Sequence, residues 1–156
     1  MNHTRRQVLR AGTGASLFAL LASAGILRPG SALAAEWNQK AYEAKNVNDA
    51  LAALGAGSPA NSNDIVMTAP EIAENGAVVP IAAASKIPGT ESIAILIAKN
   101  PTALAANFDI PSGTDAAVST RVKLAQTTDV YALVKAQGKF YMTKKEVKVT
   151  IGGCGG

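Results

Sequence analysis

The chain has very few of the residues that build active sites. Its 156 residues include one cysteine and one histidine, and that histidine, His3, lies in a segment that we expect to be removed. Without it, a Ser-His or Cys-His nucleophilic site is excluded, and so are a zinc site with histidine ligands and a blue-copper site. We therefore expect no catalytic residue and no metal site in the functional chain.

The only cysteine lies between two pairs of glycines. Residues 152–156, the C-terminal arm, consist of Cys154 flanked by Gly152, Gly153, Gly155 and Gly156. Glycine has no Cβ and populates most of φ/ψ space, so this composition predicts a flexible arm. Two interpretations are open: a disordered tail with an incidental cysteine, and an arm that presents sulfur to other proteins. No neighbouring histidine or second cysteine is available to activate the thiol, so another protein has to activate or load it.

The opposite end of the chain has the three parts of an export signal. Arg5 and Arg6 precede an apolar stretch over residues 15–27, and Ala32-Leu33-Ala34 resembles a cleavage site. The arginine pair is typical of the twin-arginine route, so we expect a signal peptide over residues 1–34, cleavage after Ala34 and a periplasmic location. The apolar stretch is shorter than the roughly 20 residues of a membrane-spanning helix. We therefore expect no stable membrane association.

Removing the signal changes the charge balance. The chain has 15 Lys and Arg against 11 Asp and Glu, and four of the arginines lie in residues 1–34, which leaves 15 − 4 = 11 against 11. A net charge near zero argues against a nucleic-acid partner. A local group of lysines remains before the arm, and it has two interpretations: a solvated edge strand, and a surface that guides anions or partners to the thiol. This group is Lys139, Lys144, Lys145 and Lys148.

Residues 35–63 are predicted to form a short N-terminal helix and a connector. Asn46 is a good N-cap, apolar residues from Val47 to Leu54 recur on one helical face, and Gly55 ends the pattern. The connector, residues 55–63, is rich in Gly, Ser, Pro and Asn.

Residues 64–151 are predicted to form an immunoglobulin-like antiparallel β-sandwich, which makes the fold class all-β. Apolar and polar residues alternate in short runs, which is typical of strands with one buried face. Turn residues such as Asn75-Gly76 and Gln137-Gly138 separate the runs. Seven or eight short strands at this spacing favour a sandwich. The candidate strands are 64–69, 77–83, 92–98, 103–110, 117–125, 129–136, 139–143 and 146–151.

The predicted core is poor in large side chains. Aromatic residues make up 4% of the chain, and alanine fills presumed interior positions within residues 80–84. Burying alanine contributes less than the roughly 1.5–3 kcal/mol of a buried leucine or phenylalanine. We therefore favour a partner that completes the core over a marginal monomer.

The segment from Val149 to Gly156 resembles the C-terminus of the SoxY family, the sulfur-carrier subunits of the bacterial Sox thiosulfate-oxidation system. The twin-arginine signal, the helix over residues 46–55, the segment 74–80 and the Asn100-Pro101 turn also resemble that family. The resemblance therefore extends over most of the chain that follows the signal.

The resemblance implies a function and a set of partners. It implies a heterodimer with a smaller β-sandwich subunit, SoxZ, and a covalent link between the Cys154 thiol and thiosulfate, made by a haem-containing conjugating enzyme. A sulfate-releasing hydrolase and, in some organisms, a sulfane dehydrogenase would then act on the adduct. The carrier itself would be no enzyme and would bind no cofactor, haem or metal.

The C-terminus also suggests three other roles. A thiocarboxylate carrier, suggested by Gly155-Gly156, is loaded in the cytoplasm, which conflicts with an export signal. Prenylation requires a cysteine fourth from the end, and Cys154 is third from the end. The remaining alternative is a structural immunoglobulin-like exported domain that uses Cys154 for an intermolecular disulfide.

Overall fold

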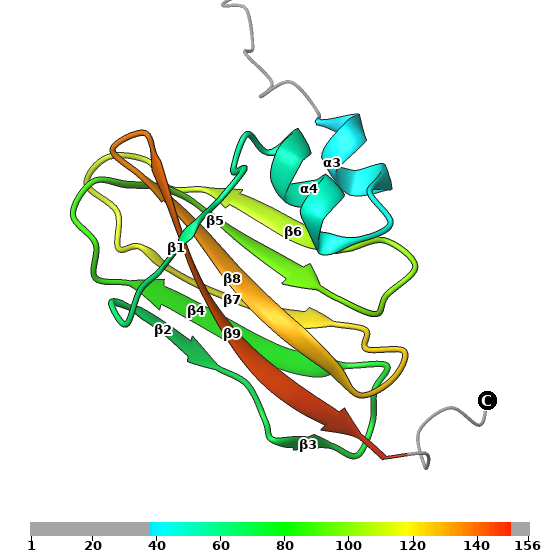
Figure 1. The fold of residues 1–156 in the computed structure, drawn as a ribbon. Helices are drawn as coiled ribbons and strands as arrows, with labels where there is room; N and C mark the ends of the chain where they lie inside the picture. Colours follow the sequence, from blue (N-terminus) through cyan, green and yellow to red (C-terminus); the bar gives the residue numbers. More distant parts are fainter. Residues whose placement is uncertain (1–37, 151–156) are drawn as a thin grey trace, which may run out of the picture. The chain divides into compact units, whose positions relative to one another are not determined.

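The computed structural model describes residues 38–150, which fold into two facing β-sheets with two short helices (Figure 1). The predicted all-β sandwich is confirmed. The larger sheet has the order β1 (Ala60–Asn61), β9 (Lys139–Val149), β8 (Thr128–Ala136), β5 (Thr90–Ile97) and β6 (Leu104–Asp109), with β3 (Ile72–Ala73) also paired to β9. The smaller sheet has the order β2 (Ile65–Thr68), β4 (Val79–Ser85) and β7 (Ala117–Val122).

Two helices stand where the sequence predicts one. Helix α4 (Val47–Ala53) begins as expected, because the Asn46 side chain accepts a hydrogen bond from the Asp49 N–H at 2.9 Å. Gly55, at φ +76°, follows its C-terminal end in the left-handed conformation that glycine favours. The additional helix, α3 (Gln39–Glu43), has its own cap in Asn38. The Asn38 amide also donates to the Ala53 carbonyl at 2.9 Å, which ties the two helices together.

The core between the sheets is aliphatic. Ile93, Ile95 and Ile97 of β5 face Val79 and Ile81 of β4, and each of these side chains is almost completely buried. The aromatic side chains that touch this core, Phe108 and Tyr141, are only partly buried. Isoleucine and valine therefore fill the interior, as their fit to pleated surfaces favours.

The centre of the larger sheet is buried on both faces, whereas the sequence predicts strands with one buried face. All residues of β5 from Ile93 to Ile97 are buried. Ala94 and Leu96 point away from the sandwich core and pack with Leu133 against the helices, which cover this outer face (Figure 1). The helices thus form a third layer over one side of the sandwich. Neither of these helices, nor any other helix within residues 38–150, is long and apolar enough to cross a bilayer.

The expectation that alanines within residues 80–84 fill the interior is wrong in part. Side chains alternate between the faces of a strand, so within residues 80–84 only Ile81 and Ala83 enter the core. Ala82 and Ala84 are half-buried on the outer face of the smaller sheet. This outer face is therefore lined by small residues.

The two strands predicted at 139–143 and 146–151 are one continuous strand, β9. It pairs with β8 from Ala136↔Lys139 to Thr128↔Val147 without interruption. Lys144 and Lys145, which lie between the two predicted strands, continue the alternation of β9. The segments β1 and β3, which the sequence analysis missed, run parallel to β9 along its other edge.

The turn between β8 and β9 lies where Gln137-Gly138 predicts it. Both residues have positive φ, +51° and +72°, as a two-residue hairpin turn requires. Glu91 supports the turn by accepting the Gly138 N–H at 3.0 Å and pairing with Lys135 at 2.8 Å. The hydrogen bond from Lys135, with that from Gly138, lowers the pKa of Glu91 below its ordinary value.

Candidate functional site

The sequence-predicted site residues lie outside the described residues. This holds for Cys154, for the four glycines of the C-terminal arm and for the expected export signal. The structure instead describes the point from which the arm continues, the end of β9 and Thr150. The geometry of this base determines where a thiol a few residues further on can begin its reach.

The end of β9 is hydrogen-bonded on both sides. On the β3 side, the Lys148 N–H donates to the Glu71 carbonyl at 2.9 Å and the Thr150 N–H donates to the Ala73 carbonyl at 3.2 Å. On the β8 side, the Val149 N–H donates to Thr127 Oγ1 at 3.0 Å. The main chain is therefore held up to the last described residue (Figure 1).

A close contact at Gly76 fixes the same end of β9 by packing. A Cβ at this position would lie 2.6 Å from the Leu124 carbonyl oxygen and 2.8 Å from Val149 Cγ1, closer than real Cβ atoms approach. The Leu124 N–H also donates to the Gly76 carbonyl at 2.7 Å. Only glycine leaves room for the chain to pass between Leu124 and Val149.

We predict that Gly76→Ala destabilises the protein by about 1–3 kcal/mol, because overpacking against a backbone carbonyl forces the chain to shift. Thermal melting measures the loss, and hydrogen exchange should show faster exchange of the Lys148 and Thr150 amides. Gly57→Ala is the matched control, because a Cβ there meets no atom within 4 Å. Equal melting of both variants would contradict the packing argument.

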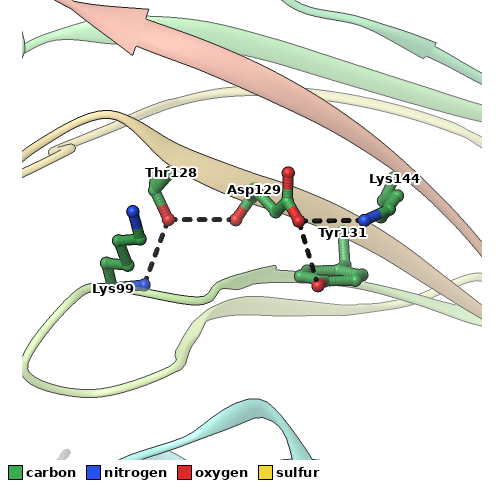
Figure 2. Close-up of polar contacts among 5 residues, drawn as sticks. All are labelled: Lys99, Thr128, Asp129, Tyr131 and Lys144. Carbon is green, nitrogen blue, oxygen red and sulfur yellow. Dashed lines mark hydrogen bonds and ion pairs between the residues drawn. The ribbon is translucent and has the colours of Figure 1, made fainter.

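Two loops are tied together beside the start of β8, which pairs with the end of β9. The Asn100 side chain donates to the Lys123 carbonyl at 2.7 Å and accepts from the Ala125 N–H at 3.2 Å. Thr128, a polar residue only 2% exposed, accepts the Lys99 N–H at 3.1 Å (Figure 2). Thr128 pairs with Val147, close to the end of β9. The hydrogen bonds of the two loops therefore help to hold the strand end from which the arm continues.

Asp129 joins two neighbouring strands through an ion pair. Its Oδ2 lies 3.0 Å from Lys144 Nζ and accepts a hydrogen bond from the Tyr131 hydroxyl at 3.4 Å (Figure 2). The hydrogen bond and charge of Asp129 raise the pKa of Lys144 above its ordinary 10.5. A raised lysine pKa stabilises the fold below the unfolded value and loses that effect as pH rises through the folded value. The pair is therefore intact at neutral pH.

The four lysines before the arm do not form one patch. Lys139 and Lys148 lie at opposite ends of β9, about 30 Å apart at the rise of a strand. Lys144 is paired with Asp129, and Lys145 donates to the Ala69 carbonyl at 2.7 Å. Lys148 is exposed near the end of β9, and Lys99 and Lys123 are exposed on the two tied loops. Exposed lysines are therefore present around the end of β9, but they are not the four lysines that were predicted to form one group.

The base offers positioning rather than chemistry. Among residues 38–150, no three His, Cys, Asp or Glu side chains come together as metal ligands. Thr127 and β3 are not predicted from the sequence, because their roles depend on contacts with residues distant in the chain. For Gly76 a signal did exist, because the segment 74–80 is one of those that resemble the SoxY family.

Comparisons with known proteins agree with this arrangement. The family model of the sulfur oxidation protein SoxY matches residues 50–154, a range that includes Cys154. The sulfur carrier protein SoxY from Chlorobium limicola f thiosulfatophilum is 41% identical, with 68% of this chain and 97% of that chain covered and a TM-score of 0.62.

A more distant likeness shows the fold alone. A superoxide reductase (neelaredoxin) from Ignicoccus hospitalis is 16% identical, with 56% of this chain and 81% of that chain covered and a TM-score of 0.50. No curated protein matches the chain. The family match covers more than half of the chain, and the SoxY structure is similar to this chain in both sequence and fold. The chain belongs to the SoxY family of sulfur carrier proteins, which function in sulfur oxidation.

Proposed function

We propose that this chain is a periplasmic carrier that holds thiosulfate-derived groups covalently on Cys154 while partner enzymes act on them. The observation that carries the proposal is that Cys154 is the only cysteine of the chain and lies inside the range that matches the SoxY family. The export signal read from residues 1–34 supports the periplasmic location.

The geometry of the base supports a carrier with a defined reach. Hydrogen bonds hold the main chain as far as Thr150, so the reach of the thiol is set by the residues that follow. From Ile151 to Cys154 is three residues, or about 10 Å at roughly 3.3–3.6 Å per residue. That length suits entry into a narrow active-site channel, and glycines next to the thiol keep the segment thin.

Loading the carrier requires an electron acceptor. The Cys154 thiol and the outer, sulfane sulfur of thiosulfate form one S–S bond, and two electrons leave together with the thiol proton. The sandwich holds no redox group among its described residues, and the haem-containing conjugating enzyme is the proposed acceptor. This division explains how the carrier serves without catalytic residues of its own.

Sulfate release then leaves sulfur on the carrier. Water attacks the sulfonate sulfur of the adduct, and the bond between the two thiosulfate sulfurs breaks. Sulfate departs, one proton of the water goes to the sulfur that stays on the carrier, and the other is released. A persulfide remains on Cys154. A sulfate-releasing hydrolase is the proposed partner for this step, and a sulfane dehydrogenase is proposed to oxidise the remaining sulfur in some organisms. We also propose a heterodimer with a SoxZ-like subunit.

Intact-mass measurement tests the class of protein. Protein exported by cells grown with thiosulfate is expected to show added sulfur or a thiosulfate group, and these additions should be absent without thiosulfate and removed by a thiol reductant. A structural domain that uses Cys154 for cross-linking would show only free thiol or a disulfide under both conditions.

A further inference from the structure

The end of β9 continues past the strand beside it. The register of β8 and β9 ends at Thr128↔Val147, whereas β9 extends to Val149. Successive N–H groups of a strand point to opposite edges, and here Lys148 and Thr150 donate to the β3 side while Val149 donates to the β8 side. The Val149 N–H is therefore a donor at a position where the ladder between β8 and β9 has ended.

A side chain takes the place of the strand ladder at this position. Thr127, in the bend just before β8, is half-buried, and its Oγ1 accepts the Val149 N–H at 3.0 Å. Threonine hydroxyls commonly bond backbone groups in this way. A partly buried N–H that loses its acceptor costs more free energy than the hydrogen bond itself contributes. The Thr127 hydroxyl therefore decides whether this end of β9 stays closed on the β8 side.

The Val149 side chain is held as well. It packs against the core of the sandwich, and its Cγ1 would lie 2.8 Å from a Cβ on Gly76, so the main chain of Gly76 lies directly against it. The next residue, Thr150, is exposed and donates its N–H to the Ala73 carbonyl at 3.2 Å. Val149 is therefore held through both its backbone and its side chain, which makes it the fixed point before the arm.

We infer that Thr127 is a positioning residue for the C-terminal arm, an inference that rests on the carrier role of the proposed function. Its hydroxyl keeps Val149 in the sheet, so that Cys154 starts its reach from one place on the sandwich. Without that hydroxyl, the start of the arm moves back toward Val147, a completely buried residue. Residues 148 and 149 then lengthen the free segment by about 7 Å.

Loss of the hydroxyl is expected to affect binding of the arm rather than the chemistry on it. Chain ends open with free energies near zero, so a tenfold change in the opening equilibrium, about the value of one hydrogen bond, lowers the closed fraction measurably. A partner enzyme binds productively only the closed fraction, and its apparent affinity falls in proportion. The loss therefore appears in KM, whereas kcat, which describes the arm already bound in the enzyme, is unchanged.

Amide exchange and loading kinetics test the inference on the exported protein, purified as the cell makes it. Thr127→Val keeps the shape of the side chain and removes the acceptor, so the Val149 amide should exchange about tenfold faster. The KM for loading with thiosulfate by the conjugating enzyme should rise about three- to tenfold at unchanged kcat. Thr127→Ser keeps the hydroxyl and should restore both the exchange rate and KM.

The matched control removes a comparable hydrogen bond far from the arm. Thr90, also half-buried, donates from Oγ1 to the Ile87 carbonyl at 2.8 Å and pairs with Ala136 at the opposite end of β8. Thr90→Val should lower the melting temperature about as much as Thr127→Val does, but it should leave KM and the exchange of the Val149 amide unchanged.

A role of Thr127 in general stability gives a different result. Equal KM or equal Val149 exchange in a folded Thr127→Val protein overturns the inference and leaves the carrier role standing, and so does the same rise in KM in Thr90→Val. Failure of Thr127→Ser to restore KM also overturns it. Thr127→Ala repeats the test if Thr127→Val does not fold. Absence of loading in the unchanged protein overturns the proposed function, and this inference with it.

Discussion

Cys154→Ser is expected to abolish thiosulfate-dependent sulfate production completely while leaving the thermal midpoint nearly unchanged. A serine hydroxyl cannot form the S–S bond on which loading depends, so no intermediate can be carried. The stability should change little, because serine differs from cysteine by a single atom, four glycines surround the position, and substitutions away from packed groups cost little. The measurement is sulfate production in a strain that lacks its own copy of the gene, supplied with either version.

The comparison needs a variant that alters the same region but keeps the thiol. Thr150→Ser keeps the backbone hydrogen bond to Ala73 and should support sulfate production fully. Full sulfate production by the Cys154→Ser strain would refute a carrier role for this cysteine. Loss of activity in both strains would point to a defect in export or assembly instead.

The double change Gly152→Ala with Gly153→Ala is expected to slow loading and release by partner enzymes. An added Cβ meets the walls of a narrow channel, and a residue bound at positive φ loses a further 1–2 kcal/mol, or about tenfold in rate. The reach of the thiol is unchanged, so a small thiol reagent should modify Cys154 at the same rate in both proteins. Enzyme turnover and reagent labelling, measured on the same preparations, distinguish a loss of fit to the enzyme channel from a loss of thiol reactivity.

A passive spacer gives a different result. If residues 152 and 153 only set the distance to the thiol, the double variant should be turned over at the normal rate by every partner enzyme, and that outcome would contradict the channel argument. Gly57→Ala serves as the control, since this exposed connector glycine has an open surrounding.

Local signals predicted the elements that local contacts stabilise. The Asn46 cap and Gly55 define α4 through residues next to it in the chain, and Gln137-Gly138 defines the last turn by its own positive φ. Strand alternation likewise marked the longer strands of both sheets, although it divided β9 in two. Such features are visible in a sequence because each depends on a few consecutive residues.

The remaining features depend on contacts between distant residues. The partners of Lys144 and Lys145, Asp129 and the Ala69 carbonyl, are remote in the chain, so these contacts could not be predicted from the lysines alone. The outward direction of Ala82 follows from the strand register, which composition does not reveal. The same distinction applies to the candidate site. Cys154 can be identified in the sequence because it is the only cysteine, whereas the packing of Gly76 against Val149 can be seen only in the fold.

Mass spectrometry of the C-terminal peptide shows whether Cys154 carries thiosulfate-derived sulfur. Cells are grown with thiosulfate isotopically labelled at its outer, sulfane sulfur, and the peptide is isolated without reductant. The account predicts a thiosulfate adduct and a persulfide, both labelled and both assigned to Cys154 by fragmentation. A peptide that shows only free thiol or disulfide during active thiosulfate oxidation would contradict the account.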